Sequence, residues 1–356
     1  MAERGIDLLA ISPSDDLRWL LGFSPTADER ACMLLLGRDN ESFVVPRLNA
    51  EQTRVALLQT PLEAWDDAAG PHRALERALE SIDMPAEPAV AVDGTMRADA
   101  LLLLQGALTG ARFVSAATVL APLRAIKDAP ELELLAASAR TADAAVRAGL
   151  AACVAEATEF EVAEAAAAAF RDAGAEVLFT SVAAGQNGAF PHHHTSGSRL
   201  QDGDAVTIDV GGRLRGYASD ITRMAHVGEP AERYTQVHGV VEEAVQAGLA
   251  AARPGVTCAE VDRAVRGVIA AAGLGEYFVH RTGHGLGLST HEPPSIMAGE
   301  ETVLAPGMVF SVEPGVYVPG ELGVRVEEIV RVTETGCEIL SNLPRDVYLA
   351  GRSLQR

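Results

Sequence analysis

Two aspartates in neighbouring strand-like segments have a spacing that suggests chemistry. Asp209 lies in VTIDVGG and Asp220 in GYASDITR, and the short segment GRLRG joins them. If Leu214 and Arg215 form a hairpin tip, the aspartates stand directly opposite each other, with Cβ atoms about 5 Å apart. Carboxylates that close repel each other, and a pair of metal ions about 3.5–4 Å apart would remove the repulsion. Two solvated aspartates beside a turn are the alternative.

A glycine-rich segment, RTGHGLGLSTHEPP, supplies histidines. His284 has a glycine on each side, which lets the backbone approach a ligand closely, and its neutral imidazole suits Mn, Co, Fe or Zn. His280 and His291 are nearby in the sequence. A single histidine in such a loop is usually structural, but three close together, with two carboxylates elsewhere, favour a metal site.

Two glutamates occur in apolar, strand-like segments further along the chain. Glu313 lies in FSVEPGVYV, where the following Pro-Gly pair ends or bends the strand. In GVRVEEIVRV, alternation places Arg325, Glu327 and Ile329 on one face of a single strand. Glutamate is disfavoured among β-branched residues, so Glu327 is a ligand or one half of a salt bridge. Four carboxylates and one imidazole favour hard or borderline metals such as manganese and disfavour structural zinc.

These motifs resemble those of the family that contains creatinase, prolidase, aminopeptidase P and methionine aminopeptidase, whose catalytic domain has the pita-bread fold. The family's metal ligands are Asp, Asp, His, Glu and Glu in that order. The matching positions here are Asp209, Asp220 (in SDITR), His284 (in GHGLGL), Glu313 (in EPG) and Glu327 (in RVEE). The resemblance implies two divalent metal ions per chain, bridged by Asp220 and Glu327. Manganese is the expected metal, with cobalt, zinc or iron as alternatives.

The resemblance also implies metal-assisted peptide hydrolysis and points to four side chains around the substrate. These are His192 (in FPHHHT), His280, His291 and Arg325, which stands beside the last ligand. His192 or His291 would stabilise the negative charge that develops on the substrate. Glu313 would handle the proton, first as a base and then as an acid.

The substrates implied by the resemblance are Xaa-Pro peptides, and the chain is most like a bacterial Xaa-Pro dipeptidase, or prolidase. Many prolidases carry an arginine four residues after the position of His291, which grips the free carboxylate of a dipeptide. This chain has Ser295 there. A buried carboxylate without a cation is costly, so another cation is needed. Arg47, which follows the strand SFVVP, is the candidate, supplied by the N-terminal domain of the same or a partner subunit.

Three alternatives to a dipeptidase remain. An enzyme like aminopeptidase P would release the N-terminal residue from longer Xaa-Pro peptides. Some pita-bread domains have lost catalysis and bind histones or RNA, but these usually lack metal ligands, and a net charge of −20 disfavours RNA. The third alternative is a metal-dependent enzyme of this fold that acts on something other than a peptide.

The elements that must position these residues divide the chain into two domains. Residues 1–122 are expected to form a smaller α/β domain of the creatinase type. It has strands in ACMLLLG and SFVVP and helices in PHRALERALE and ADALLLLQGAL. Residues 123–356 are expected to form the α+β catalytic domain, a pita-bread fold with a curved antiparallel sheet and helices. Capping-box pairs predict three of its helix starts: Asp128 with Glu131, Thr158 with Glu161, and Thr257 with Glu260.

Composition restricts the compartment and the partners. The net charge of −20 disfavours nucleic acid and anionic membranes as partners. The four cysteines are far apart, which fits a reducing cytosol, and the N-terminus has no signal-peptide core. No apolar run is long enough to span a bilayer. We therefore expect a cytoplasmic enzyme that acts on small peptides and, by analogy with the family, forms a homodimer.

Overall fold

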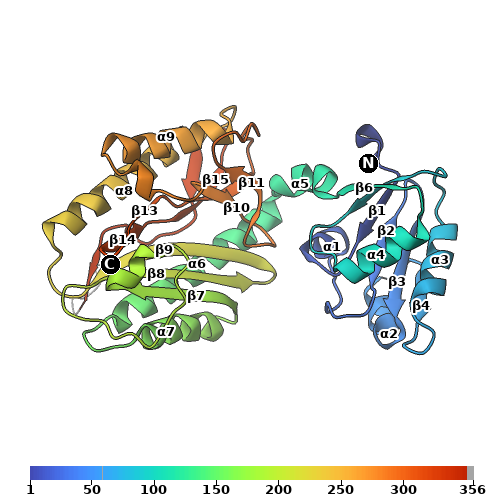
Figure 1. The fold of residues 1–356 in the computed structure, drawn as a ribbon, viewed down its shortest axis with the longest axis horizontal. Helices are drawn as coiled ribbons and strands as arrows, with labels where there is room; N and C mark the ends of the chain where they lie inside the picture. Colours follow the sequence, from blue (N-terminus) through green and yellow to red (C-terminus); the bar gives the residue numbers. More distant parts are fainter. Residues whose placement is uncertain (58, 351–356) are drawn as a thin grey trace. The chain divides into compact units, whose positions relative to one another are not determined.

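The computed structural model describes residues 1–57 and 59–350. The chain divides into two compact units between Arg124 and Ala125. The first unit has a six-stranded mixed sheet in the order β4-β3-β2-β1-β5-β6 (Figure 1). Its elements are η1 (Ala2–Arg4), β1 (Leu8–Ile11), α1 (Asp15–Leu21), β2 (Met33–Leu36), β3 (Glu41–Pro46), α2 (Arg47–Ala56), β4 (Leu62–Trp65), α3 (His72–Glu80), β5 (Ala89–Val92), α4 (Ala98–Ala107), β6 (Arg112–Ser115) and α5 (Ala117–Ala125).

Helices cover both faces of this sheet, so its central strands are apolar throughout. In β1, Leu9 packs with residues of α1, α2 and α5, while Leu8 packs with residues of α3 and α4. The strands predicted in ACMLLLG and SFVVP are β2 and β3, and the two predicted helices are α3 and α4. These predictions from periodicity are confirmed.

The second unit contains three sheets, with strand orders β17-β9-β8-β7, β11-β10-β12-β15-β16 and β13-β14. Its elements are α6 (Ala129–Ala152), α7 (Glu159–Asp172), β7 (Glu176–Ala184), η2 (Gly185–Ala189), β8 (Ala205–Leu214), β9 (Tyr217–His226), α8 (Glu232–Ala251), α9 (Cys258–Ala271), η3 (Gly275–Tyr277), β10 (Gly283–Gly285), β11 (Glu292–Ile296), β12 (Val309–Val312), β13 (Gly315–Val318), β14 (Leu322–Arg325), β15 (Glu328–Val332), β16 (Cys337–Ile339) and β17 (Tyr348–Leu349). Apart from β17 with β9, the paired strands are antiparallel.

Each pair of helices in this unit covers its own set of strands. Helices α6 and α7 pack on β7, β8 and β9 through residues such as Phe170 and Ile208. Helices α8 and α9 pack on β12, β14 and β15 through residues such as Val245 and Phe310 (Figure 1). All three predicted capping boxes are formed, at the starts of α6, α7 and α9. The described residues include no helix long and apolar enough to cross a membrane.

The hairpin of β8 and β9 turns one residue later than expected, so the predicted pairing of its aspartates is wrong. Asp209 lies opposite Thr222, and not opposite Asp220. The turn residues, Arg215 and Gly216, both have positive φ (52° and 92°), as a type I′ turn requires. Moving the turn by one residue shifts the pairing by two. Both aspartates therefore still project from the same face of the hairpin.

The segment GVRVEEIVRV forms two strands, although its alternation predicted one. Strand β14 ends at Arg325 and pairs with β13, whereas β15 begins at Glu328 and pairs with β12. Glu313 and Pro314 separate β12 from β13 at the same level. Pro314 has no backbone N–H to donate to a neighbouring strand. The break between β12 and β13 lies opposite the break between β14 and β15. Glu327 therefore lies at a break between strands, across from the break that holds Glu313.

Candidate metal centre

The five predicted ligands line one pocket of about 500 Å³. Donor atoms of Asp209, Asp220 and Glu327 all lie within 4.8 Å of one another, as do those of His284, Glu313 and Glu327. Asp220, His284 and Glu327 are buried. The hairpin supplies two of these side chains, β10 supplies the imidazole, and the two strand breaks supply the glutamates. Elements far apart in the sequence thus bring together two overlapping donor groups that share Glu327.

The imidazole of His284 is aimed at the carboxylates. Its Nε2 lies 3.2 Å from Glu313 Oε1 and 3.7 Å from Asp220 Oδ2, and its Nδ1 faces the Gly285 carbonyl at 3.2 Å. A carbonyl accepts, so Nδ1 carries the proton and Nε2 is left as a ligand nitrogen. The flanking glycines serve strand packing, because a Cβ at Gly283 would overlap the backbone of β12.

The pocket has more negative charge than its cations balance. Burial, and then the charges of Glu327 and Asp209, raise the pKa of Asp220 well above its ordinary value. Burial, followed by Glu313 and Asp209, does the same to the pKa of Glu327. Among the described residues, Glu327 Oε1 is buried without a hydrogen-bond partner. A buried carboxylate oxygen without a donor is costly, and divalent cations would satisfy it, so this donor set fits metal ions.

Arg325 and Thr222 hold Asp209, the first of the predicted ligands, in place. Arg325 Nη2 donates to Asp209 Oδ2 at 2.7 Å, and the Thr222 hydroxyl lies 2.9 Å from both Asp209 Oδ1 and Glu327 Oε2. Arg325 Nη1 also donates to the Tyr317 hydroxyl at 2.8 Å. Arg325 was expected beside the last ligand, and in the structure its ion pair is with the first.

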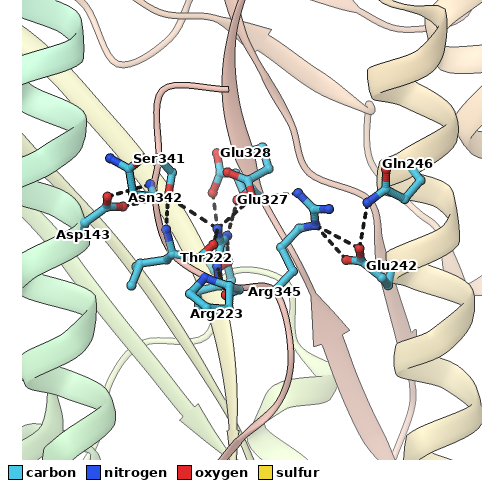
Figure 2. A network of polar contacts seen from close by, with 12 residues as sticks. Asp143, Thr222, Arg223, Glu242, Gln246, Glu327, Glu328, Ser341, Asn342 and Arg345 are labelled. Atoms are coloured by element: carbon cyan, nitrogen blue, oxygen red, sulfur yellow. Dashed lines mark hydrogen bonds and ion pairs between the residues drawn. The ribbon is translucent and has the colours of Figure 1, made fainter. Parts of the chain in front are cut away.

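A buried network fixes the backbone behind Glu327 (Figure 2). Arg223 donates to the carbonyls of Thr222 and Glu327 and pairs with Glu328 at 2.7 Å. Arg345 lies 3.1 Å from the same carboxylate of Glu328. Arg223 and Glu328 are each 1% exposed, where an unpaired charge would be strongly destabilising. The network therefore ties the β9 strand to the break that carries Glu327.

The three predicted substrate-side histidines also line this pocket. His280 Nε2 lies 2.9 Å from the Tyr317 hydroxyl. The ring of His291 stands edge-on to that of His284, with centroids 4.1 Å apart. Partial burial, and then the charges of His284 and Arg281, lower the pKa of His291 to about 4. His291 is therefore neutral at neutral pH and has one N–H to donate. His192 lines the pocket and is exposed.

Arg47 has a different local setting from the one expected. It follows strand β3 as expected, but it is also the first residue of helix α2. Its side chain is 72% exposed and lies 3.3 Å from Asp66. It belongs to the first unit, whereas the other predicted site residues belong to the second.

Arg281 and Tyr317 line the pocket and were not among the predicted site residues. Arg281 Nη1 donates to the Ser295 hydroxyl at 3.2 Å, and within the described ranges it forms no ion pair with a carboxylate. A usable signal was present, because Arg281 precedes His284 by three residues in RTGHG. The β10–β11 pairing places His284 opposite Ser295, so a side chain near His284 can reach the position where relatives have their arginine.

Fold and pocket together define a metallopeptidase with a pita-bread catalytic domain that follows a smaller N-terminal domain. Residues 133–334 match Metallopeptidase family M24, and residues 1–126 match the Creatinase/Prolidase N-terminal domain. The chain belongs to metallopeptidase family M24 and is a metal-dependent hydrolase. The resemblance inferred from the motifs is thereby confirmed.

Relatives match almost the whole chain. "Probable dipeptidase PepE" of Mycobacterium tuberculosis is 40% identical, over 98% of this chain and 93% of that protein. "Xaa-Pro dipeptidase" of Pyrococcus horikoshii is 31% identical, over 98% of this chain and 96% of that protein. The crystal structure of dipeptidase PepE from Mycobacterium ulcerans has a TM-score of 0.90 and 41% identity, and the match covers 98% of this chain and 94% of that one.

Proposed function

We propose that the chain is an Xaa-Pro dipeptidase that works with two divalent metal ions, most suitably manganese. The observation that carries the proposal is the convergence of four carboxylates and one imidazole in one pocket: Asp209, Asp220, His284, Glu313 and Glu327. Glu327 belongs to both donor groups formed by these residues, which supports its assignment as a bridging carboxylate. The family resemblance supports Asp220 as the other bridging carboxylate. The dipeptidase names of close relatives support the substrate class.

The bound metals would supply an activated water and polarise the scissile carbonyl. The chain's own residues do the rest. The Glu313 carboxylate accepts the proton of the attacking water and returns it to the leaving nitrogen. His192 and His291, outside the proposed ligand set, donate N–H groups to the substrate oxygen as negative charge develops. Arg325 keeps Asp209 oriented through its ion pair.

Selection for dipeptides needs a cation for the free carboxylate, and Arg281 fits this role. It lines the pocket beside Ser295 and forms no carboxylate ion pair within residues 1–57 and 59–350. A guanidinium can bind a carboxylate through two parallel hydrogen bonds. Arg47 from the N-terminal domain is the other candidate, and it would first have to leave Asp66.

Arg281→Met is expected to raise KM for Xaa-Pro dipeptides by about 10- to 100-fold, because a hydrogen bond to a charged group is worth about 1.5–3 kcal/mol. The KM for Xaa-Pro-Xaa tripeptides should change much less. Steady-state kinetics on both substrates check this, with Arg281→Lys as the variant that keeps the charge. If Arg47→Ala shows the dipeptide-specific rise and Arg281→Met does not, the N-terminal domain supplies the cation.

His192→Ala and His291→Ala are each expected to lower kcat by about 10²–10³, the usual value of a donor to a developing oxyanion. Metal content should remain at two ions per chain, because both residues lie outside the proposed ligand set. Parallel rate and metal measurements check this. Loss of metal with unchanged turnover per metal would show instead that these histidines are ligands. A ring nitrogen of His291 lies close enough to donor atoms of Asp220 and His284 to bind the same ion.

We also propose that the enzyme is a cytoplasmic homodimer without nucleic-acid or membrane partners. All four cysteines, which fall in the described part of the chain, are unpaired, and unpaired cysteines fit a reducing compartment. The dimer follows from the family resemblance, and light scattering would measure it. The net charge of −20 argues against a nucleic-acid partner.

Matched peptides test the proposed substrate directly. Manganese-loaded protein should cleave Ala-Pro with a higher kcat/KM than Ala-Pro-Ala, and it should cleave Ala-Ala poorly. Equal or faster cleavage of the tripeptide would make the chain an aminopeptidase P-like enzyme. Absence of cleavage of any of the three would favour a non-catalytic protein or a hydrolase for other substrates.

A further inference from the structure

Glu159 is a buried carboxylate that the mechanism does not use. It is the first residue of α7, and its exposure is 0%. Glu161, two residues further on, is exposed by contrast. It caps the start of α7 by accepting hydrogen bonds from the backbone N–H and the hydroxyl of Thr158. A fully buried carboxylate is costly unless its oxygens are satisfied, so the contacts of Glu159 are informative.

Both oxygens of Glu159 are satisfied by one segment, residues 184–196. Oε1 accepts from the Ala184 backbone N–H at 2.9 Å and from Asn187 Nδ2 at 2.8 Å. Oε2 accepts from the Ser196 N–H at 2.9 Å and from its hydroxyl at 2.8 Å. His193 Nε2 lies 2.9 Å from the same oxygen and must donate, because an ionised carboxylate only accepts. Glu159 thus closes the segment into a loop by holding both of its ends.

This loop carries His192 at the pocket. On one side of His192, the Pro191 carbonyl accepts from Arg325 Nη1 at 3.3 Å. On the other side, the His193 carbonyl accepts from the Ser181 hydroxyl at 3.1 Å, and Ser181 pairs with Asp209 across β7 and β8. The imidazole of His193 points instead to Glu159. His192 is therefore held between two neighbours whose positions are fixed, one of them by Glu159.

We propose that Glu159 is a positioning residue that sets the placement of His192 against the substrate through His193 and the ends of the 184–196 loop. The inference rests on the proposed function, in which His192 contacts the reacting group. Glutamine at position 159 would be nearly the same size as glutamate. Its amide NH₂ would replace one carboxylate oxygen, and it cannot accept the hydrogen bonds that the loop donates to that oxygen. The loop would lose its closure while the fold of α7 remained capped by Thr158 and Glu161.

Glu159→Gln is expected to lower kcat for Ala-Pro by about tenfold or more, up to the loss expected for His192→Ala, with two metal ions still bound and KM little changed. Glu161→Gln is the matched control, because the Glu161 carboxylate lies in the same helix turn but does not contact the loop. The kcat of this variant should equal that of wild type. Wild-type kcat in Glu159→Gln, or an equal loss in the two variants, would overturn the proposal.

A double-mutant cycle separates positioning from general damage to the fold. In the His192→Ala background, Glu159→Gln should cause almost no further loss of kcat, because residues that act through one another are not additive. Fully additive losses would overturn the proposal. Where Glu159→Gln does not accumulate as folded protein, Ser196→Ala, which removes one of the five contacts, should show the same non-additivity on a smaller scale.

Hydrogen exchange keeps this test independent of the proposed substrate. Glu159→Gln should speed amide exchange in residues 184–196, and Glu161→Gln should not. If wild-type protein cleaves no Xaa-Pro peptide but this difference is seen, the proposed function fails and the positioning of the loop stands. If exchange in the loop is unchanged, Glu159 does not position it.

Discussion

Asp209→Asn and Glu327→Ala are each expected to reduce hydrolysis to the background rate and to lower bound metal below two ions per chain. Asparagine removes the charge from Asp209 and keeps its shape. Glu327→Ala removes the carboxylate that belongs to both donor groups, so it should affect both ions. Metal analysis of the purified variants and assays with added manganese measure the two effects separately.

The control for these variants is Glu338→Ala, which removes an exposed glutamate on β16 that pairs with Arg331 of β15. It should keep normal activity and normal metal content, since exposed ion pairs contribute about 0–1 kcal/mol. Near-normal turnover and full metal content in either ligand variant would show that the site has been assigned to the wrong residues.

Removal of metal by chelation should inactivate the enzyme, and manganese or cobalt should restore it. Without cations, burial and the charges of neighbouring carboxylates raise the pKa of Asp220 and of Glu327; the charges that contribute most are those of Glu327 and Asp209 for Asp220, and of Glu313 and Asp209 for Glu327. Manganese is expected to restore activity best because four carboxylates and one imidazole suit a hard or borderline ion. Full activity in protein whose metal content has been measured as zero would contradict the mechanism.

The residues that gather in the pocket could be predicted from the sequence because each predicted ligand lies in a short local motif. SDITR, GHGLGL, EPG and RVEE give the residue types and their order, and the structure brings these five residues together. Helix starts were equally predictable, since a capping box such as Thr158 with Glu161 is a local pattern. The N-terminal strands and helices followed from hydrophobic periodicity.

The predictions that were wrong, such as the hairpin register and the single strand through Glu327, depended on geometry that only the folded chain specifies. The hairpin register depended on whether Arg215 would accept a positive φ beside Gly216. The break before Glu328 is absent from the alternation of its own segment and lies opposite the break at Glu313 and Pro314, which is distant in the sequence. Glu159 contacts the 184–196 loop through partners distant in the sequence, and such contacts leave no local pattern. The sequence placed Arg47 directly after its strand, but it did not show that helix α2 begins at this residue.

Anomalous diffraction from crystals grown with manganese tests the central claim most directly, because it locates the ions without reference to activity. The account predicts two manganese peaks per chain in the second unit, one coordinated by Asp209 with Asp220 and Glu327, the other by His284 and Glu313 with the same two bridging carboxylates. A single peak, two peaks on other residues, or no peak from protein that hydrolyses Ala-Pro would contradict it.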